Sequence, residues 1–553
     1  MRAFLRYGPG KAAQGNNKDN LMTQTAFDAI ARGVLVKQAL PYQDDPLALY
    51  ESLTQDAPHT LLLESAEIDS KENLKSIIMT HAALRICARG YQLEFSALDG
   101  NGHTLLPAIA AFFNIDYTDT LAQSGKLDVQ LNRDSGLLDE DARLKSTSPL
   151  DGLRALIRHI DVGNNRQFED LFLGGVLAYD LIDTVEPLPK AREGANSCPD
   201  YLFYLADTLI LVDHKAQSAE LVLTEFHTQN AGGTVQHASG KMQDELSRRA
   251  AVINAIAAKP RAPKPLKGVS LEATASVSDE DFKASVVALK EHIIAGDIFQ
   301  VVPSRSFSLP CPNSLGAYRA LRKTNPSPYM FYFRSGDFTL FGASPESALK
   351  YDASSNQVEI YPIAGTRKRG KDASGNIDHD LDGRIELELR LDKKELSEHL
   401  MLVDLARNDI ARISQSGTRK VAELLKVDRY SHVMHLVSRV TGQLRSDLDA
   451  LHAYQACMNM GTLTGAPKVR ASQLIRETEH IRRGSYGGAV GYLSGTGDMD
   501  TCIVIRSAFV KDGTAHIQAG AGVVYDSDPQ AEADETRQKA QAVISAIKMG
   551  GGL

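Results

Sequence analysis

The sequence predicts an α+β fold, in which strands follow one another in runs and a few long helices separate the runs. Apolar segments typical of strands lie at 201–212, 501–509 and 515–521, and long helical patterns lie at 395–413 and 531–549. Because the strands do not alternate regularly with helices, their order favours α+β over a parallel α/β array. A chain of 553 residues is also too long for one ordinary core, so two large units are expected.

A proline-rich segment divides the chain into these two units. The stretch KPRAPKPLKG at 259–268 holds three prolines and four Lys or Arg residues, a composition typical of a linker. We therefore predict an N-terminal lobe at 22–258, a linker at 259–275 and a C-terminal domain at 276–553. The polar, Gly- and Asn-rich residues 1–21 lack the apolar core of a signal peptide and are predicted to be a disordered extension.

Composition and charge exclude several classes of function. A net charge of −8, without any block of Lys or Arg, argues against a nucleic-acid partner. The five cysteines are scattered and form no C-x-x-C, which fits a reducing cytoplasm better than a disulfide framework or a zinc site. No apolar run approaches the roughly 20 residues that a membrane span needs, so no membrane partner is expected.

Two E-x-x-E pairs, Glu395/Glu398 and Glu532/Glu535, lie in the two long helical patterns. Residues three apart share one face of a helix, so each pair directs two carboxylates the same way. Four such acids brought together repel one another unless a cation neutralises them, and Mg²⁺ is the hard divalent cation that carboxylates hold best. Most E-x-x-E pairs are simply solvated helix faces, and only neighbouring motifs make the metal site the better interpretation.

Three glycine-rich segments, at 461–468, 484–492 and 518–524, do not match a phosphate-binding loop in spacing or context. Their glycines still allow a ligand to approach the backbone, whose N–H groups can hold a carboxylate. Arg506 and Tyr486 lie beside them, and an Arg next to glycine-rich turns is a candidate carboxylate clamp. Plain turns are the alternative interpretation.

Two further segments supply charged groups. The sequence PIAGTRKRG at 362–370 ends a predicted strand in a Gly-Thr turn followed by several cations, and GASPE at 342–346 places Glu346 just after an apolar strand. Glu346 is thus a candidate general acid near groups that could hold carboxylates and a metal.

Nine such segments occur in order over about 280–550: GDIFQVVPSR, NPSPYMFYF, FGASPES, PIAGTRKRG, ELSEHLMLVDLARNDIARIS, GTLTGAPKVRA, GSYGGAVGYLS, CIVIRSAF and QAGAGVVYDSDPQAEADET. Together they resemble the chorismate-utilising enzymes, and among these the large synthase subunits of anthranilate synthases. The resemblance implies a core of two antiparallel sheets arranged like a β-sandwich, flanked by helices, with a smaller N-terminal lobe.

The resemblance also implies roles for the motif residues. Glu398 and Glu535 would bind Mg²⁺ directly, with Glu395 and Glu532 acting through water, and Glu346 would protonate the departing C4 oxygen of chorismate. The residues similar to the family's substrate-holding positions are Gly365, Thr366, Tyr486, Arg506, Gly520, Ala521 and Gly522.

Two positions bear on the nucleophile. Relatives that hydrate chorismate carry a lysine base where this chain has Gln300, and those that form a covalent adduct carry a lysine where it has Ala364. A neutral amide cannot deprotonate water and an alanine cannot form the adduct, so the resemblance implies direct addition of ammonia. His435 and Thr462 match positions tied to the later loss of pyruvate, although an isolated His among apolar residues is more often a packed core residue.

The segments LLLES (61–65) and NPSPYMFY (325–332) resemble the family's tryptophan-binding motifs, although LLLES alone fits an ordinary buried strand. The implied inhibitor contacts are Glu64, Ser65, Lys75, Pro328, Tyr329, Met330, Val490 and Tyr492. No glutamine-hydrolysing segment is visible, so ammonia is expected from a separate glutamine amidotransferase subunit.

The function predicted from the resemblance is thus conversion of chorismate and ammonia to anthranilate and pyruvate, dependent on Mg²⁺ and inhibited by L-tryptophan. Two alternatives stay open at this point. One is a synthase that stops at 2-amino-2-deoxyisochorismate and lacks the pyruvate-releasing step. The other is a catalytically idle regulator that only binds tryptophan or chorismate.

Overall fold

The computed structural model describes residues 31–65, 75–134, 136, 138–162, 167–229, 235–236, 240–430 and 433–553. The extension predicted at 1–21 lies outside these residues. The α-helices are α1 (Pro46–Thr54), α2 (Gly100–Phe112), α3 (Asp119–Ser124), α4 (Glu140–Lys145), α5 (Asp151–His159), α6 (Gly240–Ala258), α7 (Asp279–Ile294), α8 (Ser314–Thr324), α9 (His379–Leu391), α10 (Lys393–Ile413), α11 (Ala450–Cys457), α12 (Gly461–Thr464), α13 (Lys468–Glu479) and α14 (Pro529–Gly550), with 3₁₀ turns η1 (Phe168–Asp170) and η2 (Tyr179–Thr184).

The strands outnumber the helices and occur in both halves of the chain. They are β1 (Ala31–Leu40), β2 (Thr60–Glu64), β3 (Lys75–Arg89), β4 (Gln92–Ala97), β5 (Lys126–Gln130), β6 (Ile160–Asp161), β7 (Phe172–Leu177), β8 (Tyr201–Asp213), β9 (Ser218–Gln229), β10 (Val235–Gln236), β11 (Thr274–Ala275), β12 (Gln300–Val301), β13 (Ser304–Pro310), β14 (Tyr329–Arg334), β15 (Thr339–Ser344), β16 (Ser347–Asp352), β17 (Gln357–Ile360), β18 (Ile363–Lys368), β19 (Lys420–Arg429), β20 (Val433–Gln443), β21 (Gly465–Ala466), β22 (Ala489–Ser494), β23 (Met499–Ile503), β24 (Ser507–Lys511) and β25 (Thr514–Gly520).

Two antiparallel sheets diverge from the long strands β3 and β8. The first sheet runs from β3 through β2, β14, β15, β24 and β25 to β13 and β11, and on its other side through β8 and β9 to β1. The second runs from β5 and β4 through β3, β8, β7, β22, β23, β16 and β17 to β20, which also pairs with β18 and β19. The two predicted antiparallel sheets are confirmed, and they are continuous through β3 and β8.

The passage from one sheet to the other is marked by irregular pairing. The β3–β8 register shifts repeatedly between Met79 and Leu84. On one side of this point β8 pairs with β9, and on the other side it pairs with β7. Bulges bend a strand and let it change sheets, so this irregular stretch turns one sheet into the other.

The space between the two sheets is filled by apolar side chains from both. Phe331 and Phe333 on β14 pack in the same cluster as Phe172, Val176 and Val490 from the second sheet. Met330 and Tyr332, at the intervening positions of β14, belong instead to the cluster beneath the helices. This alternation at period two is what a strand buried on both faces requires.

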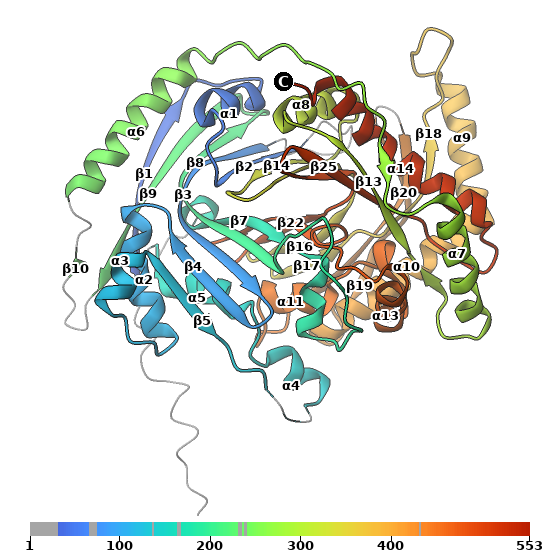
Figure 1. Cartoon of the computed structure of the whole chain (residues 1–553), viewed down its shortest axis with the longest axis horizontal. Coiled ribbons are helices and arrows are strands. Elements are labelled where there is room, and N and C mark those ends of the chain that lie inside the picture. Colours follow the sequence, from blue (N-terminus) through green and yellow to red (C-terminus); the bar gives the residue numbers. More distant parts are fainter. Residues whose placement is uncertain are drawn as a thin grey trace, which may run out of the picture.

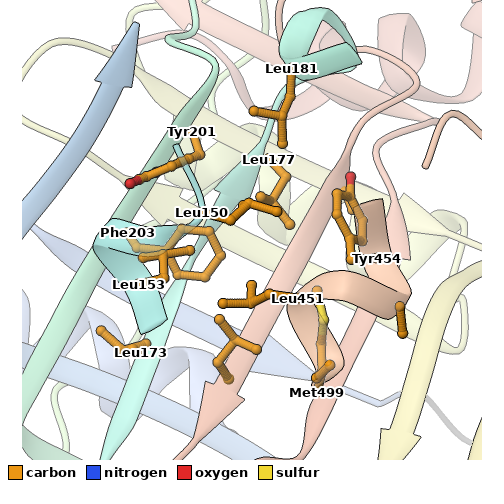
Figure 2. Close-up of a cluster of buried hydrophobic side chains, with 14 of the residues drawn as sticks. Leu150, Leu153, Leu173, Leu177, Leu181, Tyr201, Phe203, Leu451, Tyr454 and Met499 are labelled. Atoms are coloured by element: carbon orange, nitrogen blue, oxygen red, sulfur yellow. The ribbon is translucent and has the colours of Figure 1, made fainter. Parts of the chain in front are cut away.

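Helices cover the outer face of each sheet and complete a four-layer arrangement (Figure 1). Residues of α1, α6, α8 and α14 pack on the first sheet, and residues of α2, α5, α10 and α11 pack on the second. Figure 2 shows part of the second packing layer, where Leu173 and Leu177 of β7 meet Leu153 of α5 and Leu451 and Tyr454 of α11. The α+β prediction is therefore confirmed.

Several element bounds agree closely with the sequence patterns, and others were missed. The helices predicted at 395–413 and 531–549 correspond to α10 and α14. Strands β19 and β20 were not predicted, because the charged sequence KVAELLKVDR of β19 carries no clear strand pattern. Residues 259–273 contain no helix or strand, and the predicted division into lobe, linker and C-terminal domain stays a prediction.

Candidate active site

Both E-x-x-E pairs lie in the first two turns of a capped helix. The Asp392 side chain accepts hydrogen bonds from the backbone N–H groups of Lys394 and Glu395, at 3.0 and 3.2 Å, and so starts α10. Asp528 caps α14 in the same way and is followed by a proline at the first helical position. Because a helix N-terminus carries partial positive charge, it favours the carboxylates placed there.

The four carboxylates lie close enough to repel one another. The pKa of Glu398 is raised to about 7, mainly by burial and also by the charges of Glu395, Glu535 and Glu532, against the opposing effect of a nearby lysine. Burial and Glu535 also raise the pKa of Glu532, whose Oε2 is buried and has no hydrogen-bond partner among the described residues. The structure thus brings together the two pairs that helical spacing predicted to converge.

The donor set fits Mg²⁺, although cations of the protein now neutralise part of it. Within the described residues, no group of three or more His, Cys, Asp or Glu side chains is arranged so that it could hold a metal ion. Instead, Arg367 pairs with Glu395 at 2.8 Å and Lys539 pairs with Glu535 at 2.6 Å. A repelling cluster of carboxylates with one unpartnered buried oxygen is nonetheless what a hard divalent cation would relieve.

Glu346 occupies the corner between β15 and β16. Its carboxyl group is buried, and Thr462 on α12 donates a hydrogen bond to Oε1 at 3.0 Å. Burial raises the pKa of Glu346 to about 8, while the Thr462 hydrogen bond and the charge of Lys539 act in the lowering direction. Glu346 is therefore mostly protonated at neutral pH, as a general acid must be.

Arg506, Tyr486 and the glycine-rich end of β25 form a second part of the site. Arg506 has a positive φ of 49° and donates to the backbone carbonyl of Lys539 at 3.0 Å. Tyr486 contacts the backbone of Gly520, where an added Cβ would lie 3.1 Å from the tyrosine hydroxyl. Ala521, which follows, is buried and bonds to the Pro303 carbonyl. The chain here approaches Tyr486 too closely for a larger residue.

Strand β18 brings the Gly-Thr turn against His435 on β20. The Thr366 hydroxyl lies 2.8 Å from His435 Nδ1, and the pairing is bulged between Ala364 and Thr366. Gly365 in this bulge has a φ of +79°, and a Cβ there would lie 3.2 Å from Glu395 Oε2. Burial, and secondarily Arg506, lowers the pKa of His435 to about 4, so its imidazole is neutral at pH 7.

Gln300 reaches the same region from β12. Its side chain is buried, its Oε1 has no partner among the described residues, and its Nε2 lies 2.7 Å from where a Cβ on Gly522 would be. The amide therefore faces the backbone of the glycine-rich turn.

Lys539 is a site residue that the sequence did not single out. Its Nζ lies 2.6 Å from Glu535 Oε1 and donates to the Gly520 carbonyl at 3.0 Å, and its charge also acts on Glu346. The signal was present as an E-x-x-x-K spacing, which places Lys539 one turn after Glu535 on the same helix face. That spacing is so common on solvated helices that it carries little weight without the fold.

The predicted tryptophan contacts lie on or near β2, β14 and β22, and the side chains of those on β2 and β14 point to two different faces of the first sheet. Tyr329 and Tyr492 pack at the edge of the core between the sheets, to which Val490 belongs, and the Tyr329 hydroxyl donates to Asp500 at 3.2 Å. The side chain of Met330 lies on the opposite face, and the buried Glu64 carboxylate is bound there by α8.

The remaining predicted contacts extend this region. Glu64 accepts a hydrogen bond from Tyr318 at 2.6 Å and pairs with Arg322 at 3.0 Å. Glu64 lies opposite Met330, the last pair of the β2–β14 register, and Ser65 follows just beyond the end of β2. Pro328, which precedes Tyr329 on the other chain segment, is buried. Lys75 is exposed at the start of β3. The roles of these residues stay predictions.

The sequence matches the family model described as chorismate binding enzyme over residues 120–545. Anthranilate synthase component 1 of Vibrio cholerae serotype O1 is 58% identical to this chain over 509 residues, which are 92% of this chain and 95% of that protein. The chain belongs to the anthranilate synthase component 1 family. The resemblance inferred from the motifs is therefore confirmed.

Solved structures place this member of the anthranilate synthase component 1 family in a wider fold. The component I of anthranilate synthase from Streptococcus pneumoniae TIGR4 is 30% identical, with a TM-score of 0.66 over 92% of this chain and 99% of that chain. The menaquinone-specific isochorismate synthase of Escherichia coli has the same fold at 18% identity, with a TM-score of 0.64 over 96% of this chain and 98% of that chain. The fold is thus shared by proteins named for different reactions, and single side chains must distinguish them.

The carboxylate cluster predicts that Mg²⁺ stabilises the folded protein. At about 100 times its dissociation constant, Mg²⁺ should add about 2.7 kcal/mol to the free energy of unfolding. Glu398→Gln removes a buried, repelled carboxylate, so the variant should be at least as stable as wild type without Mg²⁺ and should gain much less from it. Thermal unfolding with Mg²⁺ or EDTA measures both effects.

Glu388→Gln, at an exposed position of α9, is the matched control and should keep the full response to Mg²⁺. Full Mg²⁺ stabilisation of the Glu398→Gln protein would exclude Glu398 as a ligand.

Proposed function

We propose that this chain converts chorismate and ammonia to anthranilate and pyruvate. The observation that carries the proposal is the meeting, in one region, of the two acidic helices with a buried, protonated Glu346 that Thr462 holds in place. Membership of the anthranilate synthase component 1 family supports the same reaction. Gln300 cannot act as the base that water would need, and Ala364 cannot form the covalent adduct that a lysine there would form, so both favour direct addition of ammonia.

The first half of the reaction replaces the C4 hydroxyl by an amine at C2. Mg²⁺, held by Glu398 and Glu535 directly and by Glu395 and Glu532 through water, would draw electron density toward the ring carboxylate of chorismate. Glu346 donates its proton to the C4 oxygen, which leaves as water while ammonia adds at C2. Arg506 and Lys539 supply positive charge for the carboxylates of the substrate, and Tyr486 with the Gly520–Gly522 backbone supplies hydrogen bonds.

The second half forms the aromatic ring. The proton at C2 leaves, the C3–O bond breaks, and the enolpyruvyl group takes up a proton and departs as pyruvate. We assign acceptance of the C2 proton to His435, whose imidazole is neutral at pH 7 and whose Nδ1 lies 2.8 Å from the Thr366 hydroxyl. Burial lowers the pKa of this imidazole and so makes it a weaker base than an exposed one. An enzyme that stopped at the aminated intermediate would not need this base.

The ammonia source and the regulation follow from the same assignment. Relatives are named as component 1, which implies a second component, and we propose that this is a glutamine amidotransferase that delivers ammonia. L-tryptophan would bind at the edge between the sheets, near Ser65, Tyr329, Val490 and Tyr492. All five cysteines are buried thiols, which suits a reducing cytoplasm. None of the described helices combines the length and apolarity needed to cross a bilayer.

The purified chain with chorismate, Mg²⁺ and ammonium tests the proposal, with anthranilate fluorescence and released pyruvate as readouts. Equal amounts of both products, abolished by EDTA, are expected. An aminated product without pyruvate would instead establish the intermediate-forming alternative. Tryptophan binding without any turnover would establish the regulator.

The pKa of Glu346 predicts the alkaline limb of the pH–rate profile. Only the protonated acid can donate, so kcat should fall as the pH rises through about 8. Because the folded-state pKa is raised above its ordinary 4.5, the folded state also becomes less stable as the pH rises from 4.5 to 8. Glu346→Gln should lower kcat at least about 100-fold and remove this loss of stability.

Glu388→Gln is the matched control for Glu346→Gln. It should leave the alkaline limb of the pH–rate profile unchanged. A wild-type profile that stays flat well beyond pH 9 would contradict the role of Glu346 as the acid.

The tryptophan region yields a separate prediction. Ser65 directly follows the last residue of β2, so Ser65→Phe should place a phenyl ring in the proposed tryptophan region at the edge between the sheets. The concentration of tryptophan needed for half inhibition should rise at least about 10-fold, which corresponds to about 1.4 kcal/mol of lost binding. Ammonium-dependent activity should stay within about 2-fold, a change of less than 0.5 kcal/mol on the same scale.

Ser270→Phe, at an exposed position of the 259–273 segment, controls for the added phenyl ring. Unchanged inhibition in Ser65→Phe would move the tryptophan site elsewhere.

A further inference from the structure

Arg483 carries a charge that is almost completely buried beside the site. Its side chain is 1% exposed, and that of its partner Glu479 is 5% exposed. The pair is bidentate, with Nη2 at 2.5 Å from Oε1 and Nε at 2.9 Å from Oε2. Glu479 is the last residue of α13, so the pair fixes the end of that helix against the turn that follows it.

The remaining hydrogen bonds of Arg483 reach two chain segments that carry site residues. Nη1 donates to the Leu463 carbonyl at 2.8 Å, and Nη2 donates to the Val302 carbonyl at 2.7 Å. Leu463 follows Thr462, the donor to Glu346, and Val302 lies two residues after Gln300. One guanidinium therefore joins the strand that presents the amide to the helix that presents the hydroxyl.

Two more site segments contact the same ion pair. The guanidinium carbon lies 4.7 Å from the ring centre of Tyr179 and 5.6 Å from that of Tyr486, within the range of cation–π contact. Glu479 Oε1 accepts bonds from the Ser304 backbone and hydroxyl, each at 2.8 Å. Ser304 is the register partner of Gly520, so the ion pair is one strand away from the glycine-rich turn.

Stability alone does not account for this arrangement. A buried ion pair loses so much hydration that well-packed apolar side chains of similar volume usually stabilise a fold as well or better. The guanidinium of Arg483 donates its hydrogen bonds to Glu479 and to the carbonyls of Leu463 and Val302. Leu463 and Val302 lie next to or near site residues in the chain. Arg is suited to this because its donors form a rigid planar fork.

We propose that Arg483, held by Glu479, is a positioning residue that fixes Gln300, Thr462 and Tyr486 relative to one another around the substrate. The inference rests on the proposed function, because it assigns these three side chains to one bound molecule. Arg483 itself contacts the ring of Tyr486 and makes its hydrogen bonds to backbone carbonyls and Glu479. Its effect on the reaction passes through the residues that it holds.

The connection to Glu346 provides a readout that a purely structural ion pair would not change. The Thr462 hydrogen bond lowers the pKa of Glu346. If Arg483 no longer fixes Leu463, this bond weakens and the alkaline limb of kcat moves to higher pH. A loss of folded protein lowers the rate at every pH but leaves the limb in place.

Arg483→Lys tests the proposal in the full-length chain with chorismate, Mg²⁺ and ammonium. Lysine keeps the charge but lacks the fork, so kcat per folded molecule should fall about 100-fold, the cost of misplacing reacting groups by about 1 Å. The KM for chorismate should change much less, and the alkaline limb should shift upward. Glu479→Gln, which keeps the shape of the pair, should give a smaller loss in the same direction.

Arg249→Lys is the matched control. Arg249 forms a buried pair with Asp207 at 2.8 Å, between α6 and β8, and none of its described bonds reaches the site. If Arg483→Lys loses no more kcat than Arg249→Lys and keeps the wild-type limb, Arg483 is a structural residue only and the inference fails. If Arg483→Lys does not fold, the pH dependence of kcat of Glu479→Gln replaces it as the test. An alkaline limb at the wild-type pH would then make the ion pair structural only.

A wild-type chain that makes no anthranilate would refute the proposed function itself. The wild-type rate thus distinguishes a failure of the proposed function from a failure of the role proposed for Arg483. The Arg483 variants are informative only if the wild-type chain is active.

Discussion

Glu346 and the four glutamates of α10 and α14 gather five carboxyl groups, from buried to half-exposed, in one region, and the structure treats them in two different ways. Glu346 has no neighbouring acid among the groups that shift its pKa, so burial alone keeps its proton on. Glu398 lies among three other acids, and its cluster is held by helix N-termini and by paired cations. Separate environments for similar side chains are how one site obtains both an acid and metal ligands.

This separation depends on the four layers of the fold. Helix α10 packs on the outer face of the second sheet, and α14 packs on the outer face of the first. The effect of Glu535 and Glu532 on the pKa of Glu398 shows that the two acidic pairs lie close together although their helices cover different sheets. Phe331, Phe333, Phe172 and Val490 fill the core between those sheets.

The sequence alone predicted much of this arrangement, because local patterns determine it. The helical patterns that carry the E-x-x-E pairs are local features, and they predicted α10 and α14 to within two residues at each end. The resemblance to the chorismate-utilising enzymes supplied the sandwich and the site residues. Long-range pairings stayed hidden: nothing near Arg483 in sequence reveals that it bonds to Leu463 and Val302.

Lys539 and Glu64 show the same limit for single side chains. A lysine one turn after a glutamate is ordinary on a helix surface, and only the fold places Lys539 between Glu535 and Gly520. Glu64 was assigned to tryptophan from its motif, and this role stays a prediction. Only the fold shows that its carboxylate is bound by Tyr318 and Arg322. The face of a buried strand cannot be read from a uniformly apolar run such as LLLES.

The bulged stretch of β3 between Met79 and Leu84 has a mechanical consequence. Strands β3 and β8 belong to both sheets, so the sheets cannot rotate against each other as independent plates. A change in the angle between them must bend these two strands, and the bend is easiest where the ladder is already irregular. Any change in the angle between the two sheets would therefore be taken up at this irregular stretch of β3 and β8.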